Sequence, residues 1–135
     1  VWQIEFLKLF AYLNYQQKKM EESLSHYEKA LVLSAQLQDF SMQANILGHI
    51  AVIHADVGNI EGSVDAAKNA LDLAKEIEHT EMIAEQQILL AFNFHDLKNL
   101  DKAGKYCKEA IISFELLGDS KRMEQAKILL AEIKK

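Results

Sequence analysis

The stretch from Leu47 to Ala74, LGHIAVIHADVGNIEGSVDAAKNALDLA, decides the fold of this chain. Its first half repeats small, apolar or ring side chains at helical spacing, at Leu47, Ile50, Ala51 and His54. The pair Gly58-Asn59 then interrupts the pattern, and a glycine can take the positive φ that ends a helix. A second helical face follows at Val64, Ala67, Ala70, Leu71 and Ala74. The stretch therefore predicts two antiparallel helices joined by a tight turn.

The same pattern recurs along the whole chain when the sequence is shifted by 40 residues. Small residues coincide in the first helices at Ala11, Ala51, Ala91 and Ala131, and in the second helices at Ala30, Ala70 and Ala110. Large apolar residues precede the first set at Phe10, Ile50, Leu90 and Leu130. The repeat predicts units 1–40, 41–80 and 81–120 and a half unit 121–135. The expected helices are 2–17, 20–37, 41–57, 60–77, 81–97, 100–117 and 121–134.

The fold expected from this repeat is all-α, a right-handed superhelical solenoid of antiparallel helix pairs with about seven helices. One pair cannot bury its apolar face alone, so each pair covers the next in a single array over residues 1–135. The recurring alanines let helix axes approach closely where they cross, and Gly58 closes a helix. Thr80 and Asp119 are the expected N-caps. Because the chain lacks a starting Met, we expect it to be a piece of a longer protein.

Composition narrows the function classes. Half of the residues are hydrophobic and 26% are charged, with no Pro and only five Gly, which favours a helical soluble domain. The net charge of −5 argues against a nucleic-acid partner, since such modules carry a basic face. No long apolar run predicts a membrane span or a signal peptide. A lone cysteine, Cys107, fits a reducing compartment, and the cytoplasm is the expected location.

The repeated columns resemble the tetratricopeptide repeat. That pattern consists of a large apolar residue, a large–small pair, an aromatic, a Gly, an Ala, an aromatic and an Ala. Unit two carries the corresponding residues at Leu47, Ile50, Ala51, His54, Gly58, Ser63, Ala67 and Ala70. The period of 40 exceeds the usual value of about 34, and the usual Pro is absent. Units of this length resemble those of kinesin light chains and of bacterial peptide-responsive regulators.

The resemblance implies a binding surface, because in this family the first helix of each pair lines a concave groove. The implied partner-binding positions are Lys8, Tyr12, Tyr15, Asn45, His49, Val52, Asp56, Glu85, Ile88, Phe92 and Asp96. Around them lie Glu5, Gln16, Leu89, His95, Gln125, Ile128 and Leu129. Tyrosines are enriched at binding surfaces, and amides both donate and accept hydrogen bonds. The acidic members indicate a partner with basic residues. The alternative is that these side chains pack against a neighbouring pair or another segment of the parent chain.

One known function of the family is not expected here. Adaptors that hold the acidic C-terminal tail of heat-shock chaperones use a clamp of Lys and Asn, then Asn, then Lys and Arg. The corresponding positions in this chain are Lys8, Tyr12, His49, Glu85 and Leu89. Only Lys8 matches, and Glu85 would repel a terminal carboxylate. Chaperone tails are therefore unlikely partners from the sequence alone.

No catalytic or metal-binding pattern is found in the sequence, and no cofactor is expected. The single Glu-x-x-His, Glu76 to His79, lies at a helix end and lacks the second copy that a di-iron bundle needs. Gly58-x-x-x-Gly62 lacks the Lys-Ser/Thr ending of a phosphate loop. Cys107 is expected to be a small buried residue. His54 is expected to be packed and hydrogen-bonded, and a pairing of His49 with His95 is the less favoured option.

Two functional hypotheses remain open, and neither is an enzyme. The first is a protein–protein or protein–peptide interaction module of a larger scaffold. The second is the sensor domain of a bacterial transcription regulator or signalling protein, in which a peptide or partner protein in the groove switches an attached domain. Self-association is a third kind of contact to expect, because Trp2 shares a column with Met42 and Met82 and would be bare at the end of the array.

Overall fold

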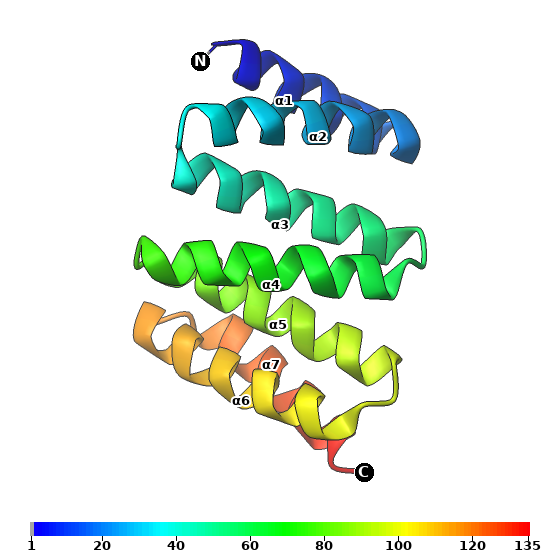
Figure 1. Ribbon diagram of the computed structural model, residues 1–135. Helices are drawn as coiled ribbons and strands as arrows, with labels where there is room; N and C mark the ends of the chain where they lie inside the picture. Colours follow the sequence, from blue (N-terminus) through cyan, green and yellow to red (C-terminus); the bar gives the residue numbers. More distant parts are fainter. Residues whose placement is uncertain (1) are drawn as a thin grey trace.

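Seven α-helices follow one another in the computed structural model, which describes residues 2–135 (Figure 1). They are α1 (Trp2–Gln16), α2 (Met20–Gln36), α3 (Phe40–Asp56), α4 (Ile60–Glu76), α5 (Thr80–Asp96), α6 (Leu100–Leu117) and α7 (Ser120–Ile133). Val1, the first residue of the predicted unit 1–40, lies outside the described residues. Within residues 2–135 there is no strand, and the predicted all-α solenoid is confirmed. The observed helix ends lie within one or two residues of the predicted ones.

The helices stack in the order of the sequence. Each packs against its neighbours along the chain, so α1 and α7 lie at opposite ends of the array (Figure 1). In addition α3 contacts α5, so the first helices of the second and third units meet directly. Near-neighbour packing of this kind is typical of helical repeat proteins, in which each unit buries the face of the next. The first helices α1, α3, α5 and α7 thereby form one continuous surface of the array.

Every turn has the same backbone geometry. A residue with positive φ occurs every 20 residues, at Lys18, Gln38, Gly58, Glu78, Lys98 and Gly118. After α3, the Gly58 N–H donates to the Ala55 carbonyl at 3.1 Å, and the Asn59 N–H donates to the His54 carbonyl at 2.8 Å. This left-handed cap satisfies carbonyls that a helix end would otherwise leave free. Only two of the six residues are glycine, so four turns carry backbone strain.

The residue after each positive-φ residue is the N-cap of the next helix. The side chains of Asp39, Asn59, His79, Asn99 and Asp119 each accept a hydrogen bond from the backbone N–H three residues on, whereas Lys19 makes no such bond. The expected N-cap at Asp119 is correct. The expected N-cap at Thr80 is wrong, because Thr80 is already the first helical residue. The cap is His79, whose Nδ1 accepts from the Met82 N–H at 3.2 Å.

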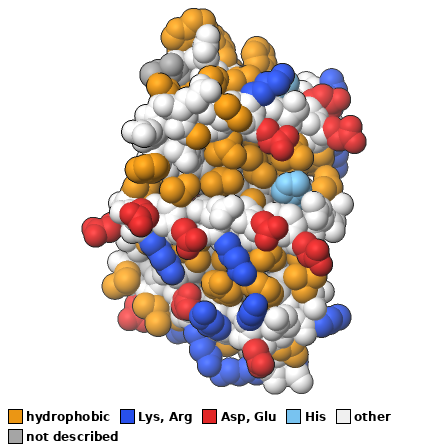
Figure 2. Space-filling model, viewed as in Figure 1, with side chains coloured by type: hydrophobic (Ala, Val, Ile, Leu, Met, Phe, Trp, Pro, Cys, Tyr) orange, Lys and Arg blue, Asp and Glu red, His pale blue; other side chains and the backbone are white. Residues whose placement is uncertain are grey.

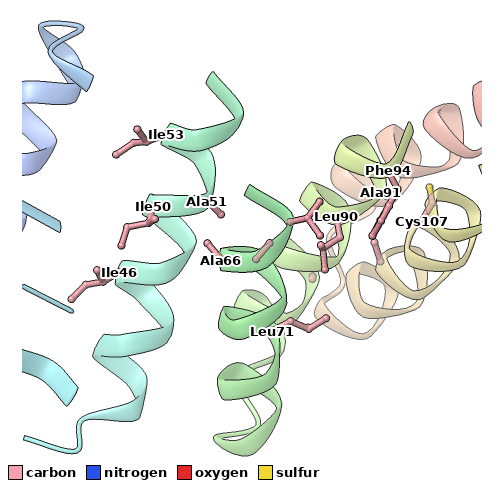
Figure 3. Close-up of a cluster of buried hydrophobic side chains, with 14 of the residues drawn as sticks. Ile46, Ile50, Ala51, Ile53, Ala66, Leu71, Leu90, Ala91, Phe94 and Cys107 are labelled. Atoms are coloured by element: carbon pink, nitrogen blue, oxygen red, sulfur yellow. The ribbon is translucent and has the colours of Figure 1, made fainter. Parts of the chain in front are cut away.

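The core is a continuous strip between first and second helices (Figure 3). The repeat alanines Ala11, Ala30, Ala51, Ala70, Ala91 and Ala110 are buried in it, and Phe94, Leu90 and Cys107 extend it towards α7. Side chains this small allow close crossing of helix axes. Ala131 differs, since it is exposed. The equivalent alanines of the other units are fully buried.

Three polar side chains of α5 are buried, and in the first two units their columns hold apolar residues. Asn93 is 1% exposed, and its amide donates to the Ser63 hydroxyl at 2.8 Å. Gln87 accepts from the Ser113 hydroxyl at 2.6 Å. Both bonds join α5 to a second helix, so they satisfy buried groups and tie neighbouring helices together. The third side chain, Gln86, is described with the site below.

Candidate functional site

Three hollows lie in line along the surface of the first helices, and together they are called the groove here. The α1–α3 hollow of about 140 Å³ is lined by Tyr12, Tyr15, Tyr27, His49, Val52 and Ile53. The α3–α5 hollow of about 470 Å³ is lined by Ala44, Asn45, Gly48, His49, Val52, His79, Glu81, Met82, Glu85, Gln86 and Leu89. The α5–α7 hollow of about 370 Å³ is lined by Ile88, Phe92, Phe114, Arg122, Gln125 and Ala126. His49 and Val52 border both of the first two hollows, so these two are continuous.

The α1–α3 hollow is aromatic. The Tyr15 hydroxyl donates to Asp56 at 2.6 Å and links α1 to α3. This bond, followed by partial burial, raises the pKa of Tyr15. The His49 ring stacks on Tyr27 with centroids 5.2 Å apart and an interplanar angle of 6°. Although the edge of His49 is exposed, one ring face is covered, and the lost hydration and then nearby Lys8 lower the pKa of His49. Both causes favour the neutral form of the His49 ring.

The α3–α5 hollow carries polar and acidic side chains. Asn45 of α3 and Gln86 of α5 line it, with both amide oxygens buried, and Glu81 and Glu85 line it from α5. Partial burial and then neighbouring Glu81 raise the pKa of Glu85, and Arg122 opposes the shift. Gly48 lies opposite Gln86, because a Cβ at Gly48 would stand 2.8 Å from the Gln86 Nε2 atom. The absence of a side chain at Gly48 thus makes room for the Gln86 amide.

The α5–α7 hollow is mainly apolar and is bounded by one arginine. The Arg122 guanidinium lies over the Phe114 ring, 5.1 Å from its centroid. It also pairs with Glu81 at 3.2 Å, with Glu85 at 3.6 Å and with Asp119 at the start of α7. Arg122 therefore separates the acidic α3–α5 hollow from the apolar α5–α7 hollow. Phe92, 48% exposed, presents much of its ring to solvent at the apolar end.

Most of the predicted binding positions lie on this groove. The lining includes Tyr12, Tyr15, Asn45, His49, Val52, Glu85, Ile88 and Phe92. Lys8, Asp56 and Asp96 line none of the three hollows. Asp56 instead accepts the bond from Tyr15, and Asp96 is an exposed residue at the end of α5. Placement on the groove is a matter of position, so the binding role of these residues stays a prediction.

Among the groove residues that sequence reasoning missed, three matter most for its chemistry. Gln86 gave a signal, since it occupies the column of Ile46 and Ala126, where a buried amide is out of pattern. Gly48 gave a signal too, as a glycine inside a helix. Arg122 gave none, because its three acidic partners come from α5 and from the start of α7.

The remaining cysteine and histidine residues singled out from the sequence occupy ordinary structural positions. Cys107 is fully buried, its thiol lies 3.1 Å from the Ala126 carbonyl, and burial raises its pKa. His54 is half-buried and lies 3.3 Å from the Asn59 amide. His49 stacks on Tyr27, and no contact joins it to His95 among the described contacts. Within residues 2–135, no group of three or more His, Cys, Asp or Glu side chains is arranged to hold a metal ion.

The opposite face of the array differs from the groove. The face that α2, α4 and α6 present in Figure 2 carries acidic and basic side chains interspersed over apolar ones. Mixed charge of this kind is typical of a solvated surface. In the part of the chain that the structure describes, no helix has the length and apolar character to cross a membrane.

The arrangement of helices is that of tetratricopeptide-type helical repeat proteins. No protein-family profile and no curated protein sequence matches the chain. The apo form of RapI superposes with a TM-score of 0.92 at 18% identity, over 99% of this chain and 49% of RapI. A Rap protein complexed with competence and sporulation factor gives 0.80 at 24% identity, over 96% of this chain and 36% of that protein.

A third solved structure is similar over a still smaller share of its length. It is a signal transduction ATPase with numerous domains and a tetratricopeptide repeat sensor from Pyrococcus horikoshii, with a TM-score of 0.87 at 21% identity. The match covers 95% of this chain and 20% of the ATPase. The chain thus spans about half or less of each of these three proteins. Identities this low establish a shared fold and leave function to be argued from the groove.

Proposed function

We propose that the groove binds an extended segment of another protein or a peptide. The observation that carries the proposal is the alignment of the three hollows across α1, α3, α5 and α7. A segment lying along them would meet aromatic rings at Tyr12 and Phe92 and amides and acids between. Large apolar rings beside a few polar groups are the usual composition of a recognition surface.

Exposure of the two rings supports the proposal. Tyr12 is 50% exposed and Phe92 is 48% exposed, so both rings are open to a partner. Aromatic side chains give large contact areas for little loss of side-chain entropy. Truncating one that acts as a binding hot spot costs about 2 kcal/mol or more, which lowers the affinity tenfold or more. The proposal assigns binding to this groove and assigns no catalysis to it.

A second candidate is a sensor role within a larger regulatory protein. It is favoured by the solved structures of similar fold, which include a Rap protein with competence and sporulation factor and an ATPase with a tetratricopeptide repeat sensor. In a stacked array, a segment bound across several first helices would alter their spacing and so the position of whatever is attached to the ends. Both candidates share the groove and a cytoplasmic setting, and they differ only in what binding causes.

Selection from a phage-displayed library of random peptides tests the proposal. Enriched peptides should bind the parent chain, and a Tyr12→Ala, Phe92→Ala double variant should bind them at least about tenfold more weakly. The matched control is a Val32→Ala, Ile112→Ala double variant, because these two side chains are as exposed but lie on second helices. Circular dichroism confirms that all three proteins are equally helical.

Two outcomes would count against the groove. If the Val32→Ala, Ile112→Ala variant loses the peptides and the Tyr12→Ala, Phe92→Ala variant keeps them, the binding surface is on the second helices. If selection enriches no peptide for the parent chain, the groove does not bind extended segments.

A further inference from the structure

One side of α1 carries five large apolar side chains that are open to solvent, and it is called the α1 face here. Trp2 is 68% exposed, Phe6 49% and Phe10 51%. Leu9 and Leu13 are exposed to a similar extent. The rings contact one another, since Trp2 meets Phe6 edge-on at 5.2 Å and Phe6 stacks on Phe10 at 6.4 Å between centroids. Figure 2 shows hydrophobic side chains at the end of the molecule where α1 lies. Contiguous exposed patches of this kind usually mark interaction sites.

The equivalent face of α3 shows what kind of surface this is. Forty residues after Phe6 and Leu13 stand Ile46 and Ile53, which are 0% and 2% exposed. Their side chains point towards the helices that precede α3 (Figure 3), and α2 packs against α3. In the second unit these columns therefore receive a helix. On α1 the same columns are apolar, and no helix within residues 2–135 covers them.

The spacing along the α1 face makes it complementary to itself. Intervals of four, three and four residues separate its central members, Trp2, Phe6, Leu9 and Leu13. This is the spacing of paired helices, and it is the same when read in either direction. An antiparallel second copy therefore places Trp2 opposite Leu13 and Phe6 opposite Leu9, so that each layer holds one ring and one leucine. A parallel copy would put rings on rings at one end and leucines on leucines at the other, which would force the helix axes apart at the ring end.

The α1 face is also free of charge. The two charged residues of α1, Glu5 and Lys8, fall outside the spacing, and Lys8 lies near His49 on the groove side. Exposed glutamines flank the face, with Gln3 and Gln16 each three residues from one of its members. In an interface between identical copies each patch meets itself, so a charged centre would repel its own image. An apolar centre with a neutral polar rim avoids that repulsion.

The exposed area is on the scale of a small dimer interface. Aromatic side chains have about 150–250 Å² each to bury, so the exposed fractions of the three rings correspond to roughly 350 Å² per copy. Leu9, Leu13 and the glutamine rim add to this area. A standard interface buries about 800 Å² of each partner, and weaker ones bury less. The area therefore fits a dimer that forms and dissociates with concentration.

We propose that the α1 face joins two copies of this chain into an antiparallel homodimer. Helix α1 of each copy takes the place over the other that α2 has over α3. The groove stays open in this dimer, because Tyr12 and Tyr15 lie on a different side of α1, towards α3. The inference goes beyond the proposed function and does not depend on it.

Sedimentation equilibrium over roughly a hundredfold range in concentration tests the dimer, because association follows mass action. The mass of the parent chain should rise from 15.3 kDa towards twice that value. Trp2 is the one tryptophan of the chain, so its emission should shift to shorter wavelength along the same curve as it is buried. A Phe6→Glu variant should associate at least about tenfold more weakly, since it places a carboxylate in an apolar interface. The matched control, Ile112→Glu on α6, changes a side chain that is 61% exposed and should associate like the parent chain.

A nitroxide on a Gln3→Cys variant tests the orientation, and brief labelling spares the buried Cys107. Mixed with a ¹⁵N-labelled parent chain, it should broaden the amide signals around Leu13 and spare those around Gln3. A mass that stays at 15.3 kDa, or equal association by the Phe6→Glu variant and the parent chain, would overturn the dimer. Broadening around Gln3 instead of Leu13 would overturn the antiparallel arrangement. Circular dichroism checks that the variants are as helical as the parent chain. Peptides selected for the groove should bind the Phe6→Glu variant and the parent chain equally, so failure of the dimer and failure of the proposed function are separate results.

Discussion

The buried bond between Asn93 and Ser63 allows a quantitative test of how the units are held together. Asn93 of α5 is 1% exposed, and Ser63 of α4 is 0% exposed, so neither group can turn to water when its partner is removed. The repeat supplies the replacements, since Ala103 occupies the column of Ser63 and Ile53 occupies the column of Asn93.

The three variants have different expected stabilities. Ser63→Ala leaves the Asn93 amide buried without its acceptor, and should lower the free energy of unfolding by about 1–3 kcal/mol. Asn93→Ile costs less, because a serine hydroxyl can turn to a helix carbonyl, as Ser23 does to the Ala11 carbonyl at 2.6 Å. The double variant should be close to the parent chain or more stable, because both partners are then apolar.

Urea unfolding followed by circular dichroism measures these free energies, with the slope compared across variants to check that unfolding stays cooperative. Combining the four proteins gives the coupling free energy between the two side chains. A coupling of about 1 kcal/mol or more is expected. A coupling below about 0.5 kcal/mol, with Ser63→Ala as stable as the parent chain, would refute the reasoning. The units would then be held by apolar packing alone.

Three further predictions follow from the backbone, the core and the groove. Glu78→Gly should raise stability in urea by up to about 1 kcal/mol, because it relieves positive φ, whereas Asp72→Gly, at an exposed position inside α4, should lower it by a similar amount; equal signs would contradict this. Ala51→Leu should lower stability by about 1–3 kcal/mol through overpacking of a helix crossing, and a neutral result would show that the crossing is loose. The pKa of His49 is lowered in the fold, so the unfolded chain binds the proton more readily; stability should be complete above the usual pKa of 6.5 and fall as the pH drops below it. His49→Gln should remove that part of the pH dependence in urea titrations at several pH values.

The periodic columns were sufficient to predict the fold. Apolar spacing and recurring alanines located all seven helices. In a stacked array, equivalent positions of each unit have the same packing surroundings, so they carry similar residues. Turn chemistry was less visible. A glycine in the sequence indicates the positive φ at Gly58 and Gly118. Lys18, Gln38 and Glu78 adopt a positive φ without being glycine. Their conformation follows from the fixed spacing of the flanking helices rather than from their own preference.

The groove could be placed on the first helices from the sequence, but its chemistry could not. Whether Asn45 finds a partner depends on which side chains of α5 lie across from it, and no local pattern fixes that. The same holds for Gln86, whose significance appears only beside Gly48 on the neighbouring unit. The hydrogen bond between Asp56 and Tyr15 likewise depends on the distance between α1 and α3. Spacing in the sequence defines faces of single helices, while sites arise between them.

The reactivity of the Cys107 thiol can report on the detachment of α7. The thiol is sealed under α7, with its sulfur 3.1 Å from the Ala126 carbonyl, so a reagent in solution reaches it only when α7 lifts away. Within residues 2–135, α7 packs chiefly against α6, and an element with few packing partners opens more often than the rest. The rate of thiol modification in native buffer therefore measures how often α7 detaches. A bound segment that contacts both α5 and α7 would lower the rate of Cys107 modification, and one that stays near α1 would leave this rate unchanged.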